Sequence, residues 1–155
     1  MNDISILEKL GVDIGYKTTH VKTITEADIN LFAEVSGDFN PVHISEEYAK
    51  KTFFGGRIAH GVIAVGLLSA AMAKLPGLVV FLSQSVRFLK PVRIGDTITA
   101  IVEVIETHQD EGIVTLKNTC INQEGETVVD GEAKCRLYQP PSNTYSIECS
   151  YLTII

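Results

Sequence analysis

Long runs rich in β-branched and other apolar residues occupy the second half of the chain, with turn-forming residues between them. They span residues 78–89, 97–109, 113–123 and 126–139. Runs of this length, separated by such short turns, are typical of antiparallel strands, and the last three predict a meander. A similar run from Tyr16 to Ile24 predicts an earlier strand. The pattern therefore predicts a sheet of about five strands.

Two short helices are predicted after the first strand. Thr25 and Asp28 form a capping-box pattern, and apolar residues at helical spacing follow over 27–35. Gly37 is expected to end this helix. Ser45 is a second N-cap candidate, with acidic residues directly after it, and predicts another helix to about residue 51.

The longest predicted helix runs from about Gly61 to Leu75. It is apolar around nearly its whole circumference, so we expect it to be surrounded by protein. It is also shorter than the roughly 20 residues that a membrane span needs, and no membrane anchor is predicted.

The sheet and the long helix together define the fold class. A sheet with one apolar face has to cover that face, and wrapping it around the long helix is the economical arrangement. We therefore predict an α+β hotdog fold, in which an antiparallel sheet wraps around a long central helix. A single domain is expected over residues 1–155, with its core at about 15–138. The apolar tail, residues 140–155, is either an added strand or an interface segment.

Composition and charge narrow the class of protein. The chain has 155 residues, 45% hydrophobic and 21% charged, with a formal net charge of -6. These values are typical of a globular protein, and the negative charge argues against binding to nucleic acid. The three cysteines are widely spaced, without a zinc-type cluster, which favours reduced thiols in a cytoplasmic protein. No signal peptide is predicted.

The stretch "SGDFNPVHIS", residues 36–45, contains the first candidate chemistry. Asn40 and Pro41 resist regular helix and predict a compact reversal between Asp38 and His43. Such a reversal lets the carboxylate and the imidazole face one spot, as acid/base catalysis requires. The alternative is an Asx-turn aspartate and a loop histidine that binds backbone groups.

The stretch "GGRIAHG" precedes the long helix and contains Arg57, His60 and Gly61. A helix N-terminus has free N–H groups and a partial positive charge, so it suits a developing oxyanion. The alternative is a flexible loop in which Gly61 allows close packing and His60 packs or caps. Ser69, two turns into the helix, either bonds to a backbone carbonyl or supports the site. A metal site built on Asp38, His43 and His60 is the alternative, but no metal is predicted, since no single element carries a ligand pair at metal-binding spacing.

These residues carry a resemblance to a known family. "FAEVSGDFNPVHIS" followed by "FFGGRIAHGVIAVGLLS" closely resembles the MaoC-like (R)-specific enoyl-CoA hydratases, or hydratase 2. That group includes the hydratases that supply polyhydroxyalkanoate synthesis. The shared pattern is Asp-x-Asn-Pro-aliphatic-His, then a Gly/Ile/His/Gly segment that opens the central helix. The resemblance extends from about Gly15 to Tyr138.

The resemblance implies a hotdog homodimer that acts on acyl-CoA thioesters. It implies that Asp38 and His43 are the catalytic dyad and that the Gly61 N–H lies in the oxyanion hole. Asn40 and Ser69 then have supporting roles. The expected reaction is hydration of trans-2-enoyl-CoA to (3R)-3-hydroxyacyl-CoA, with no cofactor beyond the coenzyme A of the substrate.

The negatively charged phosphates of coenzyme A are expected to bind positively charged side chains near the site. The candidates are Arg57, Lys74, Arg87, Lys90 and Arg93, of which Arg57, Arg87 and Lys90 are preferred. Solvated surface charge is the alternative for each of them.

Three other functions stay open. Hotdog thioesterases and 3-hydroxyacyl dehydratases resemble this chain in fold and substrate, but commonly have a carboxylate on or before the central helix. This chain has no Asp or Glu between Tyr48 and Gly95, which favours the hydratase. A non-catalytic acyl-binding hotdog subunit is the third alternative, although such a subunit is expected to have lost Asp38 or His43.

Overall fold

The computed structural model describes residues 4–141, which form five helices and five strands. The helices are α1 (Ile6–Lys9), α2 (Glu26–Ser36), α3 (Pro41–Ile44), α4 (Glu46–Lys50) and α5 (Gly61–Met72). The strands are β1 (Lys17–Thr23), β2 (Leu78–Phe88), β3 (Thr97–His108), β4 (Ile113–Ile121) and β5 (Thr127–Tyr138). The predicted tail, 140–155, lies almost wholly outside the described residues.

All five strands belong to one antiparallel sheet with the order β1-β3-β4-β5-β2. β3, β4 and β5 form the predicted meander. The turns between them contain Gly112 and Gly125, whose φ angles are 65° and 78°, a conformation that glycine adopts without a steric cost. The predicted five-stranded antiparallel sheet is therefore confirmed.

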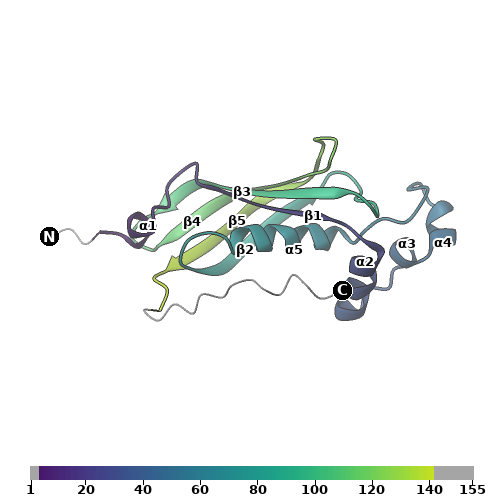
Figure 1. Cartoon of the computed structure of the whole chain (residues 1–155), viewed down its shortest axis with the longest axis horizontal. Helices are drawn as coiled ribbons and strands as arrows, with labels where there is room; N and C mark the ends of the chain where they lie inside the picture. The colour runs from purple at the N-terminus through teal and green to yellow at the C-terminus, as the bar shows by residue number, and fades with distance from the viewer. Residues whose placement is uncertain (1–3, 142–155) are drawn as a thin grey trace.

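Helix α5 packs on one face of the sheet, where it forms the centre of the core (Figure 1). Leu68 of α5 and Val102, Leu116 and Val129 of the sheet are at most 1% exposed. The Thr18 hydroxyl of β1 also donates to the Ala71 carbonyl of α5 over 2.6 Å. The hotdog arrangement of a sheet around a central helix is thus confirmed.

The capping signals place α2 and α4 as predicted. Thr25 and Asp28 form both bonds of the capping box, and Gly37 ends α2 with a φ of 77°. The Ser45 hydroxyl accepts from the Tyr48 N–H at the start of α4.

The residues around Pro41 are helical, contrary to the expectation that they resist helix. Asn40 is the N-cap of α3 and accepts from the Val42 N–H, and Pro41 occupies the first helical position. Proline fits there because that position needs no N–H donor. The predicted reversal is therefore a one-turn helix. The four-residue helix α1, capped by Ser5, was not predicted at all.

Helices α2, α3 and α4 lie together beyond one end of the sheet, next to the start of α5 (Figure 1). This arrangement brings the two candidate motifs together. Among residues 4–141, no helix is both long and apolar enough to cross a membrane.

Candidate active site

Asp38 lies directly after the left-handed Gly37 that ends α2. Its backbone N–H donates to Ser36 Oγ, and its Oδ1 accepts from the Asn40 N–H, each over 3.1 Å. These bonds fix the loop, while the side chain of Asp38 stays 50% exposed. Asn40 therefore contacts the Asp38 carboxylate and caps α3, which carries His43.

His43 is the third residue of α3, and its ring is half-buried. Nδ1 lies 2.9 Å from the Ile58 carbonyl oxygen. A carbonyl can only accept, so the neutral ring carries its proton on Nδ1. The Nε2 atom is then left as a proton acceptor.

His60 is buried under this pair. Its imidazole ring packs at a tilt against two neighbouring rings, with centroid distances of 3.9 Å to His43 and 4.8 Å to Phe32. Its Nε2 lies 2.9 Å from the Asp38 carbonyl oxygen and 3.9 Å from Asp38 Oδ2. His60 therefore packs against the dyad and holds the Asp38 backbone, but it makes no side-chain cap for α5.

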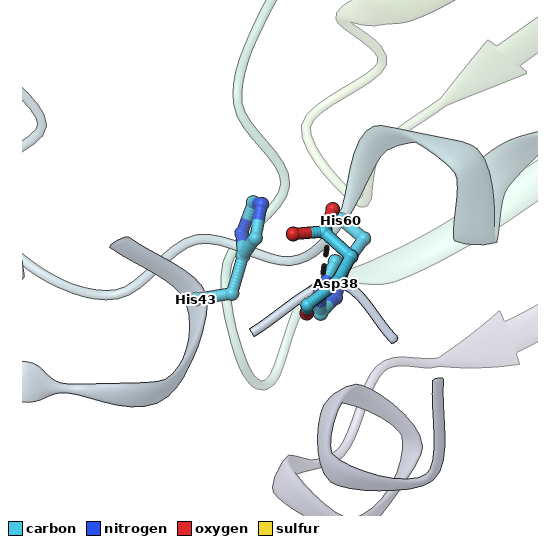
Figure 2. Close-up of side chains that lie close together, drawn as sticks. All are labelled: Asp38, His43 and His60. Atoms are coloured by element: carbon cyan, nitrogen blue, oxygen red, sulfur yellow. Dashed lines mark hydrogen bonds and ion pairs between the residues drawn. The ribbon is translucent and has the colours of Figure 1, made fainter. Parts of the chain in front are cut away.

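The three side chains converge. Asp38, His43 and His60 each offer one carboxylate oxygen or ring nitrogen, and these atoms all lie within 4.8 Å of one another. Figure 2 shows the Asp38 carboxylate directed toward the His43 ring. A water molecule about 2.8 Å from each of two such atoms bridges a gap of this size.

Carboxylate and imidazole groups are also metal ligands. His43 and His60 also each direct a ring nitrogen to a backbone carbonyl. The cluster thus combines a carboxylate with two imidazoles, each of which has one ring nitrogen beyond the one that contacts the backbone.

Gly61 opens α5 beside His43. As the first residue of the helix, its N–H has no intrahelical partner. A Cβ at this position would lie 2.7 Å from two ring atoms of Phe88, so any larger residue has to displace that ring or the start of α5. The strand β2 thus packs closely against the start of α5.

An apolar pocket of about 450 Å³ lies at this point. His43 and Gly61 line it together with the aromatic side chains of Phe53, Phe54 and Phe88. A polar, proton-accepting atom and a free helix N-terminus thus face an apolar cavity, which suits a substrate with a reactive carbonyl and an apolar part.

Ser69 lies elsewhere within the described chain. It is exposed on α5, eight residues after Gly61, and lines a separate pocket with Met72 and Phe81. Eight helical residues correspond to about 12 Å. The described residues therefore do not bring Ser69 to the Asp38–His43 pair.

The three preferred cations lie in different environments. Lys90 lines the apolar pocket and pairs with Glu126. Arg87 is 76% exposed and makes a two-pronged contact with Asp130. The Arg57 side chain is only 10% exposed and bonds within the protein. No local sequence pattern indicates this internal role of Arg57, or the contact of the Ile58 carbonyl with His43.

Fold and site together define a hotdog protein with a carboxylate–imidazole pair at the start of its central helix. Residues 11–124 match the family model described as MaoC-like domain. The chain belongs to this family.

Relatives named as hydratases or dehydratases share most of the chain. The (R)-specific enoyl-CoA hydratase of Rhodospirillum rubrum is 45% identical over 77% of this chain and 83% of the relative. The 3-hydroxybutyryl-CoA dehydratase of Methylorubrum extorquens is 41% identical over 84% of each. The unliganded R-hydratase from Pseudomonas aeruginosa superimposes with a TM-score of 0.77 at 41% identity, over 83% of each chain.

Proposed function

We propose that this protein catalyses the reversible hydration of trans-2-enoyl-CoA to (3R)-3-hydroxyacyl-CoA. The observation that carries the proposal is the convergence of Asp38 and His43 within 4.8 Å beside the apolar pocket. The relatives named as (R)-specific hydratases support the substrate class and the stereochemistry.

The tautomer of His43 suggests how water is activated. Because Nδ1 donates to the Ile58 carbonyl, Nε2 is available to accept a proton from a water held between it and Asp38. The water oxygen bonds to C3 of the enoyl thioester as this proton leaves. The carboxylate stabilises the imidazolium that forms.

The same pair completes the reaction. The electrons of the C2–C3 double bond move toward the thioester oxygen, which gains negative charge. The Gly61 N–H and the positive end of α5 stabilise that charge. The proton held by the pair then moves to C2, so that one water adds across the double bond.

The pocket beside Gly61 is the proposed position of the thioester. Among the three preferred cations, Lys90 is the one that lines this pocket, so we assign it the contact with coenzyme A. The mechanism uses no metal and no redox cofactor. We also place the protein in the cytoplasm, which agrees with the free, buried thiols of Cys120 and Cys135.

The alternatives differ in their support. Dehydration of 3-hydroxyacyl thioesters is the reverse of the proposed reaction, and the relative from Methylorubrum extorquens is named for it. Thioester hydrolysis has less support because α5 contains no carboxylate. A non-catalytic subunit has no need for the convergence of Asp38 and His43 within 4.8 Å.

We further propose a homodimer joined through β2. This strand is one edge of the sheet, and it exposes the apolar side chains of Leu78, Val80, Phe81, Leu82 and Phe88. The opposite edge, β1, carries Lys17 and Lys22 instead, and lysine protects an edge from pairing. A second copy related by a two-fold axis covers the apolar edge.

Sedimentation measurements test the dimer. We expect the wild type to sediment as a dimer and Phe81→Lys to shift it toward monomer, because the lysine places a charge in the apolar contact. A wild-type monomer at micromolar concentration contradicts this assembly.

The reaction itself is tested by loss of the enoyl-thioester absorbance with crotonyl-CoA and a longer trans-2-enoyl-CoA. We expect hydration of at least one substrate, with a product of (3R) configuration. A (3S) product, or thioester hydrolysis without hydration, rejects the proposal.

A further inference from the structure

The charged side chain of Arg57 is directed into the protein and binds the backbone of a proposed catalytic residue. Its Nε donates to the His43 carbonyl oxygen over 2.6 Å, and its Nη1 pairs with Glu26 of α2. Only 10% of the side chain is exposed. We propose that Arg57 is a positioning residue that fixes His43 for proton transfer, an inference that rests on the proposed function.

The His43 carbonyl needs such a partner because α3 is a single turn. The last carbonyls of a helix have no intrahelical N–H. Within α3 the Ser45 N–H bonds to the Pro41 carbonyl, and Arg57 supplies a donor for the carbonyl of His43. A cation is also favoured at the C-terminal end of a helix.

Arg57 and Ile58 hold His43 at two points. The guanidinium of Arg57 holds its backbone carbonyl, and the Ile58 carbonyl holds Nδ1 of its ring over 2.9 Å. Consecutive residues thus fix both the position of α3 and the orientation of the imidazole. Nε2 is thereby kept as the proton-accepting nitrogen of the ring.

The same arginine connects the helices around the site. Its backbone N–H donates to Glu46 of α4 over 3.1 Å, and its side chain reaches Glu26 at the start of α2. Helix α2 ends just before Asp38. The contacts of Arg57 therefore join the elements that carry both members of the dyad.

This role differs measurably from binding of a coenzyme A phosphate. A phosphate contact of an arginine strengthens substrate binding, so its removal raises KM for CoA thioesters but not for thioesters that lack the nucleotide. A positioning contact acts on the reacting geometry, so its removal lowers kcat for both substrates. Misplacement of a catalytic group by about 1 Å costs up to about 10²-fold in rate.

The test uses the full-length enzyme with crotonyl-CoA and crotonyl-pantetheine. For Arg57→Gln we expect kcat to fall about 10- to 100-fold with both substrates, with KM within about twofold of wild type. Arg57→Lys, which keeps a charged donor, is expected to recover part of kcat. Glu26→Gln is expected to lower kcat about twofold to fivefold, as for a partly exposed ion pair.

A matched control is Arg136→Gln. Arg136 also pairs with a glutamate, Glu111. It lies near the end of β5, whereas Phe88 of the pocket pairs with Val129 near the start of that strand. We expect its kcat and KM to equal those of wild type.

The second readout is the ¹⁵N NMR signal of the His43 imidazole, which reports the tautomer without substrate. We expect the Nδ1–H tautomer in wild type and in Arg57→Lys, and mixed tautomers in Arg57→Gln. Should Arg57→Gln fail to fold, Arg57→Lys and Glu26→Gln decide through kcat.

Several results overturn the proposal. They are an increase in KM confined to crotonyl-CoA, wild-type kcat in all the Arg57 and Glu26 variants, or a fall in kcat with unchanged His43 signals. If the wild type hydrates neither substrate, the proposed function fails, and the NMR signals still decide whether Arg57 orients His43.

Discussion

The sheet with α5 and the segment from Gly37 to Gly61 are held by different interactions. In the sheet, long strands pair in register and bury apolar side chains such as Leu116 and Val102. In the segment, one-turn helices and loops are fixed by bonds between polar side chains and backbone atoms, such as those of Asn40 and Arg57.

This difference separates stability from activity. Apolar burial is non-directional and supplies most of the folding free energy. Hydrogen bonds to the backbone add less free energy but fix direction. Substitutions in the sheet are therefore expected to change stability, and those in the segment are expected to change the rate of the reaction.

The largest expected effect is the loss of activity in Asp38→Asn. We expect kcat for crotonyl-CoA to fall about 10³-fold, since a neutral amide cannot stabilise the imidazolium that forms on His43. Its Oδ1 still accepts from the Asn40 N–H, so the urea midpoint should match wild type. Asp110→Asn, on an exposed turn, is the control and should keep full activity. A large fall in the unfolding free energy of Asp38→Asn contradicts this separation of stability from activity.

Leu116→Ala tests the sheet with α5. Leu116 is fully buried, and we expect the free energy of unfolding to fall by about 2–5 kcal/mol. The kcat of the folded fraction should stay near wild type. Leu31→Ala, which truncates a leucine that is 64% exposed on α2, is the matched control and should cost less than about 1 kcal/mol. Equal losses of unfolding free energy in Leu116→Ala and Leu31→Ala contradict the burial of Leu116 in the core.

Gly61 lies where the sheet with α5 meets the segment that begins at Gly37, and Gly61→Ala tests this junction. The added methyl has to displace the Phe88 ring or the start of α5, because the contact distance is 2.7 Å. We expect kcat to fall about 10- to 100-fold through displacement of the oxyanion donor, as measured in the crotonyl-CoA assay. Wild-type kcat in this variant contradicts the role of the Gly61 N–H.

The smallest expected effect is the pH dependence from Cys120 in the core. Burial raises the pKa of its thiol to about 12, whereas the unfolded thiol ionises near 9. The contribution of this thiol to the free energy of unfolding is therefore fully present below pH 9 and is lost as pH rises from 9 toward 12. At pH 10 we expect a loss of about 1 kcal/mol from this residue, by urea unfolding.

Cys120→Ala provides the comparison for this pH effect. The variant should show a smaller decrease in unfolding free energy between pH 8 and pH 10 than wild type. An identical decrease in both proteins indicates that Cys120 is not buried in the native state.

The sequence predicts the scaffold more completely than the site. Alternating and apolar runs located all five strands, and the capping residues Thr25 and Ser45 located α2 and α4, because these signals are local. The one-turn helix α3 was missed, because Asn40 and Pro41 serve equally well in a turn and at a helix start.

The contacts between segments could not be predicted from spacing. Arg57 was expected to bind coenzyme A, but which carbonyl its guanidinium reaches depends on how α3 packs against the loop after α4. Ser69 was expected to support the dyad, yet the helical rise places it in another pocket of the described chain. Such contacts arise from tertiary packing, which a linear motif does not encode.

The central claim is that Asp38 and His43 act as one unit, and a double-mutant cycle of kcat with crotonyl-CoA tests it most directly. The cycle compares wild type, Asp38→Asn, His43→Gln and the double variant, each with the same urea midpoint. We expect each single substitution to lower kcat about 10³-fold and the double variant to be no slower than about either single one. Independent losses that multiply in the double variant, or a single variant that keeps wild-type kcat, contradict the claim.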